Sequence, residues 1–209
     1  MTDPDPDHFE MRRLESLSNT IFGVAMTLLA YDLPKAGEFK NLPGWTDPAG
    51  DLIKSLPDWT DLYHLYSGRL AGLVLSFIIA GLFWLSHHRR LARYPHGSRG
   101  VVILNLFFLL SIILLPVTNG LYGSYRLSSA VAVLYGLHLT TIASLNAALW
   151  WFATRDGKRH PEFWAAVFPI MVFLPCTGVA LYAPQYVTYF WFIAFGGLLV
   201  RRLAGQQNA

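Results

Sequence analysis

Long apolar stretches with few charges alternate with short polar segments along almost the whole chain. About 20 mainly apolar residues are enough to cross the hydrocarbon core of a bilayer as a helix. The pattern predicts six such helices, at residues 13–33, 63–88, 100–122, 128–153, 162–183 and 185–203. The fold class that follows is an all-α integral membrane protein, with residues 1–209 forming a single six-helix transmembrane domain.

The first of these stretches is more polar than a usual membrane span. It reads RLESLSNTIFGVAMTLLAYDL, with hydroxyl and amide side chains spread among the apolar ones. Polar groups cost free energy in lipid unless they are paired or face water. We therefore expect this helix to lie inside a bundle or beside an aqueous path, and to carry the function.

A helical wheel divides this first helix into two faces. At about 100° per residue, one stripe contains Leu17, Thr20, Val24, Leu28 and Tyr31, with Thr27 at its margin. If several copies of the helix surround an axis, Val24, Leu28 and Tyr31 would form successive apolar constrictions, which can gate by dewetting. The alternative is an ordinary packing stripe between helices, which is the commoner meaning of such a pattern.

A second group of polar residues lies near the end of the second predicted helix. Trp84 and His87 are three residues apart and therefore share a face. Ser18 and Asn19 lie at the same membrane level and point away from the apolar stripe, so they could pair with the indole and the imidazole. Alternatively, His87 is an interfacial residue beside a basic loop. We interpret Asn105 as a polar contact between helices.

Composition agrees with a membrane protein. The 209 residues are 54% hydrophobic and 14% charged, whereas soluble domains carry about 25% charged residues. The formal net charge of +3 would suit nucleic acid, but the basic residues lie in short loops, as topology rules expect. We therefore expect no nucleic-acid partner.

The distribution of basic residues predicts the orientation. Eleven lie in the two termini and in the 89–99 and 154–161 loops, and four lie on the opposite side: Lys35, Lys40, Lys54 and Arg126. By the positive-inside rule, both termini are expected in the cytoplasm.

Catalytic and metal-binding patterns are not apparent in the sequence. It has no metal-ligand spacing and no nucleophile–base pair, and its single cysteine, Cys176, lies in an apolar run. We expect neither catalytic nor metal-ligating residues, no cofactor, and a protein that is not an enzyme.

Two segments of the chain match motifs of a known family. Its members begin the first helix with R-x-x-x-F-S-D and continue with a run like A-I-A-I-T-L-L; this chain reads RLESLSN from Arg13 and VAMTLL from Val24. Trp84 and His87 match the tryptophan and histidine that end the family's second helix, and Asn105 and Leu115–Pro116 match its third. The chain thus resembles the prokaryotic branch of the transmembrane protein 175 family, lysosomal-type potassium channels without a P-loop filter.

The resemblance implies a homotetramer in a prokaryotic plasma membrane, with the first helix lining a central pore. The family's hydrophobic pore positions correspond to Val24, Leu28 and Tyr31, and its pore-helix threonine to Thr27. Its structural polar network corresponds to Arg13, Ser18, Trp84 and His87, to which we add Asn19 and Asn105. The implied partners are other copies of the chain, the lipid bilayer, and potassium and other monovalent cations, with permeant potassium ions in place of a cofactor.

Two positions depart from the family pattern. Leu17 and Asn19 replace the phenylalanine and aspartate of the motif, so this chain lacks the motif's buried carboxylate. Tyr31 is larger and more polar than the usual aliphatic residue. The first departure bears on the polar network, and the second on the width of the pore.

Our leading hypothesis is a potassium-permeable cation channel with a hydrophobic constriction and modest selectivity over sodium. The alternative is a small secondary or proton-coupled transporter, in which His87 or Asp32 would titrate. That class predicts internal repeats and broken helices at the membrane midplane, and neither is visible in the sequence. An integral-membrane enzyme ranks third, because no paired catalytic groups converge.

Overall fold

The computed structural model describes residues 9–33, 59–94, 96–125, 127–153 and 161–191. These residues are almost entirely helical. The long helices are α1 (Met11–Leu29), α2 (Trp59–Arg93), α3 (Arg99–Tyr125), α4 (Ser129–Ala153) and α5 (Pro161–Ala180). A short 3-10 helix, η1 (Ala30–Asp32), follows α1, and residues 184–191 are helical as well.

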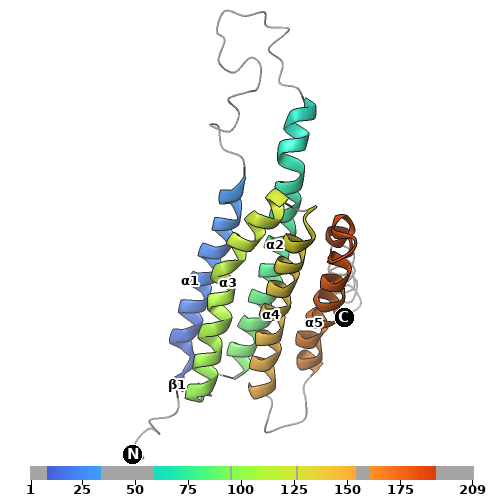
Figure 1. Ribbon diagram of the computed structural model, residues 1–209. Helices are drawn as coiled ribbons and strands as arrows, with labels where there is room; N and C mark the ends of the chain where they lie inside the picture. The colour runs from blue at the N-terminus through green and yellow to red at the C-terminus, as the bar shows by residue number, and fades with distance from the viewer. Residues whose placement is uncertain (1–8, 34–58, 95, 126, 154–160, 192–209) are drawn as a thin grey trace, which may run out of the picture.

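The helices lie side by side as a bundle, with α1 at one edge and α5 at the other (Figure 1). Helix α3 contacts α1, α2 and α4, and α4 in turn contacts α5. At one end of the bundle, strands β1 (Phe9–Glu10) and β2 (His96–Gly97) pair antiparallel. This pairing, which the sequence pattern did not suggest, ties the start of α1 to the connection between α2 and α3.

Within the described residues, four helices are long and apolar enough to cross a membrane. They contain Tyr66–Arg93, Arg99–Tyr125, Ser129–Ala153 and Phe163–Ala180, with mean hydropathies of 1.9, 2.7, 1.4 and 1.9. Helix α1 is not among them, because its hydroxyl, amide and charged side chains lower its hydropathy. The prediction of an all-α membrane protein is therefore confirmed as far as helical class and several helices of spanning length are concerned. The remainder of the sixth predicted helix lies outside the described residues.

Several helix boundaries differ by a few residues from those expected, and two of the differences affect candidate site residues. Helix α2 continues to Arg93 rather than ending at 88, so Arg89 and Arg90 belong to the helix and not to a loop; arginine favours helices almost as well as leucine does. Helix α1 ends at Leu29 instead of 33. Leu33 has an extended backbone, with φ −66° and ψ 144°, as suits a residue before a proline.

The last two helical segments form the hairpin that Pro184, placed between two apolar runs, predicts. Helix α5 ends at Ala180, and Pro184 is the first residue of the next helical segment. Proline suits this position because its fixed φ is helical and its missing N–H has no partner there anyway. Trp191 of this segment is buried, and its ring contacts Phe173 of α5 at a centroid distance of 6.4 Å.

Polar contacts cross-link the bundle interior. The Ser76 hydroxyl of α2 donates a hydrogen bond to Asn119 Oδ1 of α3 at 2.6 Å and contacts the Tyr135 hydroxyl of α4. All three side chains are buried. A buried polar group without a partner is costly, so this cluster fixes how α2, α3 and α4 sit against one another.

Helices α4 and α5 approach closely at Gly136. A Cβ atom built on Gly136 would collide with the side chain of Thr177 of α5, whose hydroxyl is held by a 2.7 Å hydrogen bond to the Phe173 carbonyl. Small residues at such crossings let helix backbones pack tightly, which drives association between helices in membranes.

We expect Gly136→Ala to destabilise the protein by about 1–3 kcal/mol through overpacking. The measurement is the melting temperature of purified protein in detergent. Gly178→Ala is the matched control, because a Cβ at Gly178 meets no atom within 4 Å. Adding Thr177→Ala to Gly136→Ala should recover part of the loss. Equal melting temperatures for the two single alanine variants would contradict the close approach.

Candidate functional site: the two faces of α1

Helix α1 has one face inside the bundle and one outside it. The inner face consists of residues that recur every three or four positions and are all buried: Leu14, Ser18, Phe22, Ala25 and Leu29. The apolar stripe of the wheel lies on the outer face, with its last member, Tyr31, in η1 beyond the end of α1. All its members are exposed in the single chain: Leu17, Thr20, Val24, Thr27, Leu28 and Tyr31. Thus the residues that the wheel groups together all point away from the chain's own core.

Both threonines of the outer face use their hydroxyl protons on their own helix. Thr20 Oγ1 donates to the Ser16 carbonyl at 3.0 Å, and Thr27 Oγ1 donates to the Val24 carbonyl at 2.8 Å. A hydroxyl has one proton and two lone pairs. Because the proton is engaged, what remains available at each oxygen is an acceptor, which suits a cation.

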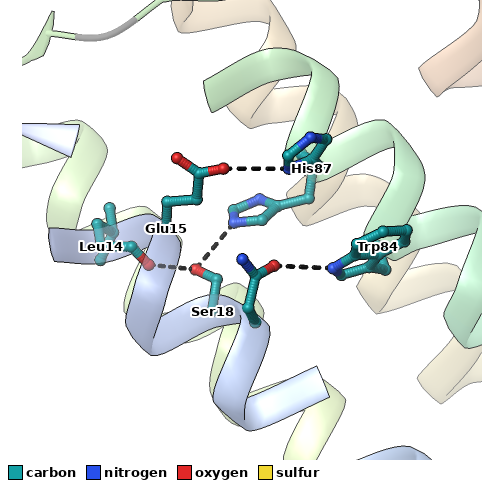
Figure 2. A network of polar contacts seen from close by, with 7 residues as sticks. Leu14, Glu15, Ser18, Trp84 and His87 are labelled. Atoms are coloured by element: carbon teal, nitrogen blue, oxygen red, sulfur yellow. Dashed lines mark hydrogen bonds and ion pairs between the residues drawn. The ribbon is translucent and has the colours of Figure 1, made fainter. Parts of the chain in front are cut away.

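The inner face is linked to α2 by a hydrogen bond between buried side chains (Figure 2). Ser18 Oγ donates to the Leu14 carbonyl at 2.6 Å, and His87 Nε2 lies 3.0 Å from the same Ser18 oxygen. Since Ser18 has given its proton to Leu14, it accepts from His87. Nε2 therefore carries the imidazole proton.

The other nitrogen of His87 meets an arginine. Arg90 Nη2 lies 3.2 Å from His87 Nδ1 and donates to Asn105 Oδ1 of α3 at 2.9 Å. A guanidinium has only donors, so His87 Nδ1 accepts and the ring is the neutral Nε2–H form. His87, Arg90 and Asn105 are all buried. The His87 ring also stacks on Phe108, with centroids 5.2 Å apart, and contacts Phe22 at 6.1 Å.

Asn19 and Trp84 form a separate, exposed pair. Trp84 Nε1 donates to Asn19 Oδ1 at 2.9 Å, and Trp84 is 36% exposed in the single chain. Trp84 stacks on His88, whose Nδ1 lies 3.1 Å from a Glu15 carboxylate oxygen. Pairing at one membrane level predicts that these four residues form a single buried network, and this prediction is wrong for one pair. Ser18–His87 is buried, whereas Asn19–Trp84 lies at the surface, because the adjacent residues Ser18 and Asn19 point about 100° apart on α1.

Two further network positions differ in their surroundings. Arg13 is exposed at the start of α1, whereas Asn105 is fully buried against Arg90. Sequence reasoning assigned Arg90 to a loop and so missed it. The available signal was its position three residues after His87, which places both on one helix face. Among the residues that the structure describes, no three His, Cys, Asp or Glu side chains come together as a metal site.

A bundle with four described helices that are long and apolar enough to cross a membrane is the architecture of a multi-pass membrane protein. Comparisons with known proteins identify its family. Residues 13–116 match the family described as the endosomal/lysosomal potassium channel TMEM175. A protein of Streptomyces collinus named as a potassium channel is 30% identical over 154 residues, which cover 71% of this chain and 66% of that relative. The match thus spans just under two thirds of the relative.

Solved structures share the fold. A potassium-selective TMEM175 homologue from Chamaesiphon minutus superimposes with a TM-score of 0.71 at 19% identity, covering 90% of this chain and 96% of that one. A variant of the potassium channel MtTMEM175, bound to a nanobody fusion protein, gives a TM-score of 0.57 at 12% identity, with 98% and 100% covered. The chain belongs to the TMEM175 family, a family of channels and not of enzymes.

We expect His87→Ala to lower the melting temperature of the detergent-purified protein well below that of Trp84→Phe. The first change removes the donor to the Ser18 oxygen and one acceptor of Arg90 inside the bundle, which costs about 1–3 kcal/mol for each group. The second removes one exposed hydrogen bond, worth about 0.5–1.5 kcal/mol. Equal losses for the two variants would contradict the division into a buried and an exposed pair.

Proposed function

We propose that this protein is a potassium-permeable cation channel in which four copies surround a central pore lined by α1. The observation that carries this proposal is the outer face of α1, where exposed apolar side chains alternate with threonine oxygens. A helix whose inner face is fixed to its own bundle can line a shared path only with its outer face. The Streptomyces collinus relative named as a potassium channel supports the choice of ion.

Conduction in this proposal depends on a hydrophobic constriction and uses no P-loop filter. Val24, Leu28 and Tyr31 follow one another at intervals of four and three residues, so under fourfold symmetry each forms a ring. Apolar rings resist hydration, and an ion must shed water to pass them. No charged side chain belongs to this stripe, so selectivity for potassium over sodium comes from the cost of dehydration, the width of the rings and the Thr27 oxygens.

The buried contacts at the base of α1 act in this proposal as a structural anchor. Ser18, His87, Arg90 and Asn105 join α1, α2 and α3, and a pore whose width depends on α1 needs that helix to keep its rotation. The Asn19–Trp84 pair, which is exposed in the single chain, would be covered by a neighbouring subunit or by lipid. The protein needs no cofactor, and its ligands are the permeant ions.

We expect Leu28→Ala to raise cation flux and to weaken potassium-over-sodium discrimination, since a smaller ring lowers the dehydration barrier. The measurement is the unitary current and the bi-ionic reversal potential of purified protein in planar bilayers. Leu29→Ala is the matched control on the adjacent residue: Leu29 is 1% exposed and packs in the core, whereas Leu28 is 45% exposed. Leu29→Ala should therefore lower thermal stability and leave selectivity unchanged.

Two results would contradict this proposal. Equal, small effects of the two alanine substitutions on flux would favour an ordinary packing stripe. Transport without unitary current steps would favour the small secondary or proton-coupled transporter.

We further propose that the protein lies in a prokaryotic plasma membrane with both termini in the cytoplasm. Because basic residues are concentrated on the side of the termini, a cysteine at Gly37, in the predicted 34–62 outer loop, should react with an impermeant maleimide on intact cells. A cysteine at Gly157, in the predicted 154–161 inner loop, should react only after permeabilisation. Both variants are made with Cys176→Ser to remove the native thiol. The reverse pattern would invert the topology.

A further inference from the structure

A second row of residues lies beside Val24 and Leu28 on the outer face of α1. It consists of Thr20, Gly23 and Thr27, which are spaced at three and four residues and therefore share a strip of the helix surface. All three are exposed in the single chain. A Cβ atom built on Gly23 would meet nothing within 4 Å, so the strip is open between the two hydroxyls.

The two threonines of this row present the same chemistry. Thr20 donates its proton to the Ser16 carbonyl and Thr27 donates its proton to the Val24 carbonyl. Each hydroxyl oxygen therefore has lone pairs free to accept, while its proton is already engaged with a backbone carbonyl. Seven residues separate them, which is about 10.5 Å along the helix. They thus lie at two different levels of the outer face, and Val24 occupies a level between them.

We infer that Thr20 is a second cation-coordinating and specificity-determining position, one level nearer the N-terminus of α1 than Thr27. This inference rests on the proposed function, since it requires α1 to line the pore. Four copies of Thr20 Oγ1 then form a ring of neutral oxygens on one side of the Val24 ring, and four copies of Thr27 Oγ1 form another on the far side.

Such an arrangement assigns a role to each level. A ring of four hydroxyl oxygens replaces part of an ion's hydration shell, so the ion reaches the apolar Val24 ring already partly dehydrated. Because sodium holds its water more tightly than potassium does, neutral oxygens at a fixed spacing favour potassium. The second ring at Thr27 receives the ion on the other side. Selectivity is then shared between two levels instead of residing at Thr27 alone.

The experiment is bilayer recording of the full-length tetramer with three threonine substitutions. Thr20→Val removes the oxygen and keeps the shape, Thr20→Ser keeps the oxygen, and Thr141→Val is the matched control. Thr141 is also an exposed helical threonine, which donates to the Leu137 carbonyl at 2.9 Å, but it lies on α4. The melting temperature of each variant is measured in parallel, and it should be similar for the two valine variants.

We expect Thr20→Val to reduce potassium unitary conductance and the potassium-to-sodium permeability ratio by about threefold or more, because an oxygen ring is lost from the path. Thr20→Ser should behave like the unchanged protein, and so should Thr141→Val. If the unchanged protein conducts potassium and Thr20→Val matches Thr141→Val, the inference is overturned while the proposed function stands. If the unchanged protein passes no potassium current, the proposed function fails and the inference fails with it.

Discussion

The hydrogen bond between Ser18 and His87 fixes the rotation of α1, and the arrangement of the outer face depends on that rotation. A helix is free to turn about its axis unless side chains on one face are tied to its neighbours. Here the link is a buried polar contact 3.0 Å long. The Phe22 and Phe108 rings, which also contact each other, both pack against the imidazole. A turn of α1 by one residue would bury polar groups without partners, which is costly in an apolar interior. The exposed positions of Val24, Thr27 and Leu28 follow from this constraint.

Much of the fold could be predicted from the sequence, because the length of each apolar stretch can be read from consecutive residues. The number and order of the helices, the turn before Pro184 and the grouping of residues on α1 each depend on a short stretch of chain. The wheel places Leu28 and Leu29 on different faces, and in the structure one is exposed and the other is buried. The pairing of Ser18 with His87 was also accessible, since both lie at one level of the membrane and both need a partner.

The features that sequence reasoning missed depend on contacts between distant segments. Arg90 counts as a loop residue when charges are taken as markers of helix ends, but Asn105 and His87 give its guanidinium acceptors inside the bundle. The close approach of Gly136 to Thr177 depends on how α4 crosses α5, which neither helix encodes alone. The separation of Asn19–Trp84 from Ser18–His87 arises because neighbouring helical residues point about 100° apart, so two residues adjacent in sequence serve different surfaces.

The direction of the hydrogen bonds around His87 has a consequence for protons. A Grotthuss chain passes a proton onward only if every member can accept on one side and donate on the other. Here Arg90 donates to His87, His87 donates to Ser18, and Ser18 donates to the Leu14 carbonyl. This series of hydrogen bonds ends at the Leu14 carbonyl oxygen, which has no proton to pass on. It begins at the Arg90 guanidinium, which stays protonated at any physiological pH. These hydrogen bonds therefore join three helices through the apolar interior, and they do not by themselves relay a proton along α1.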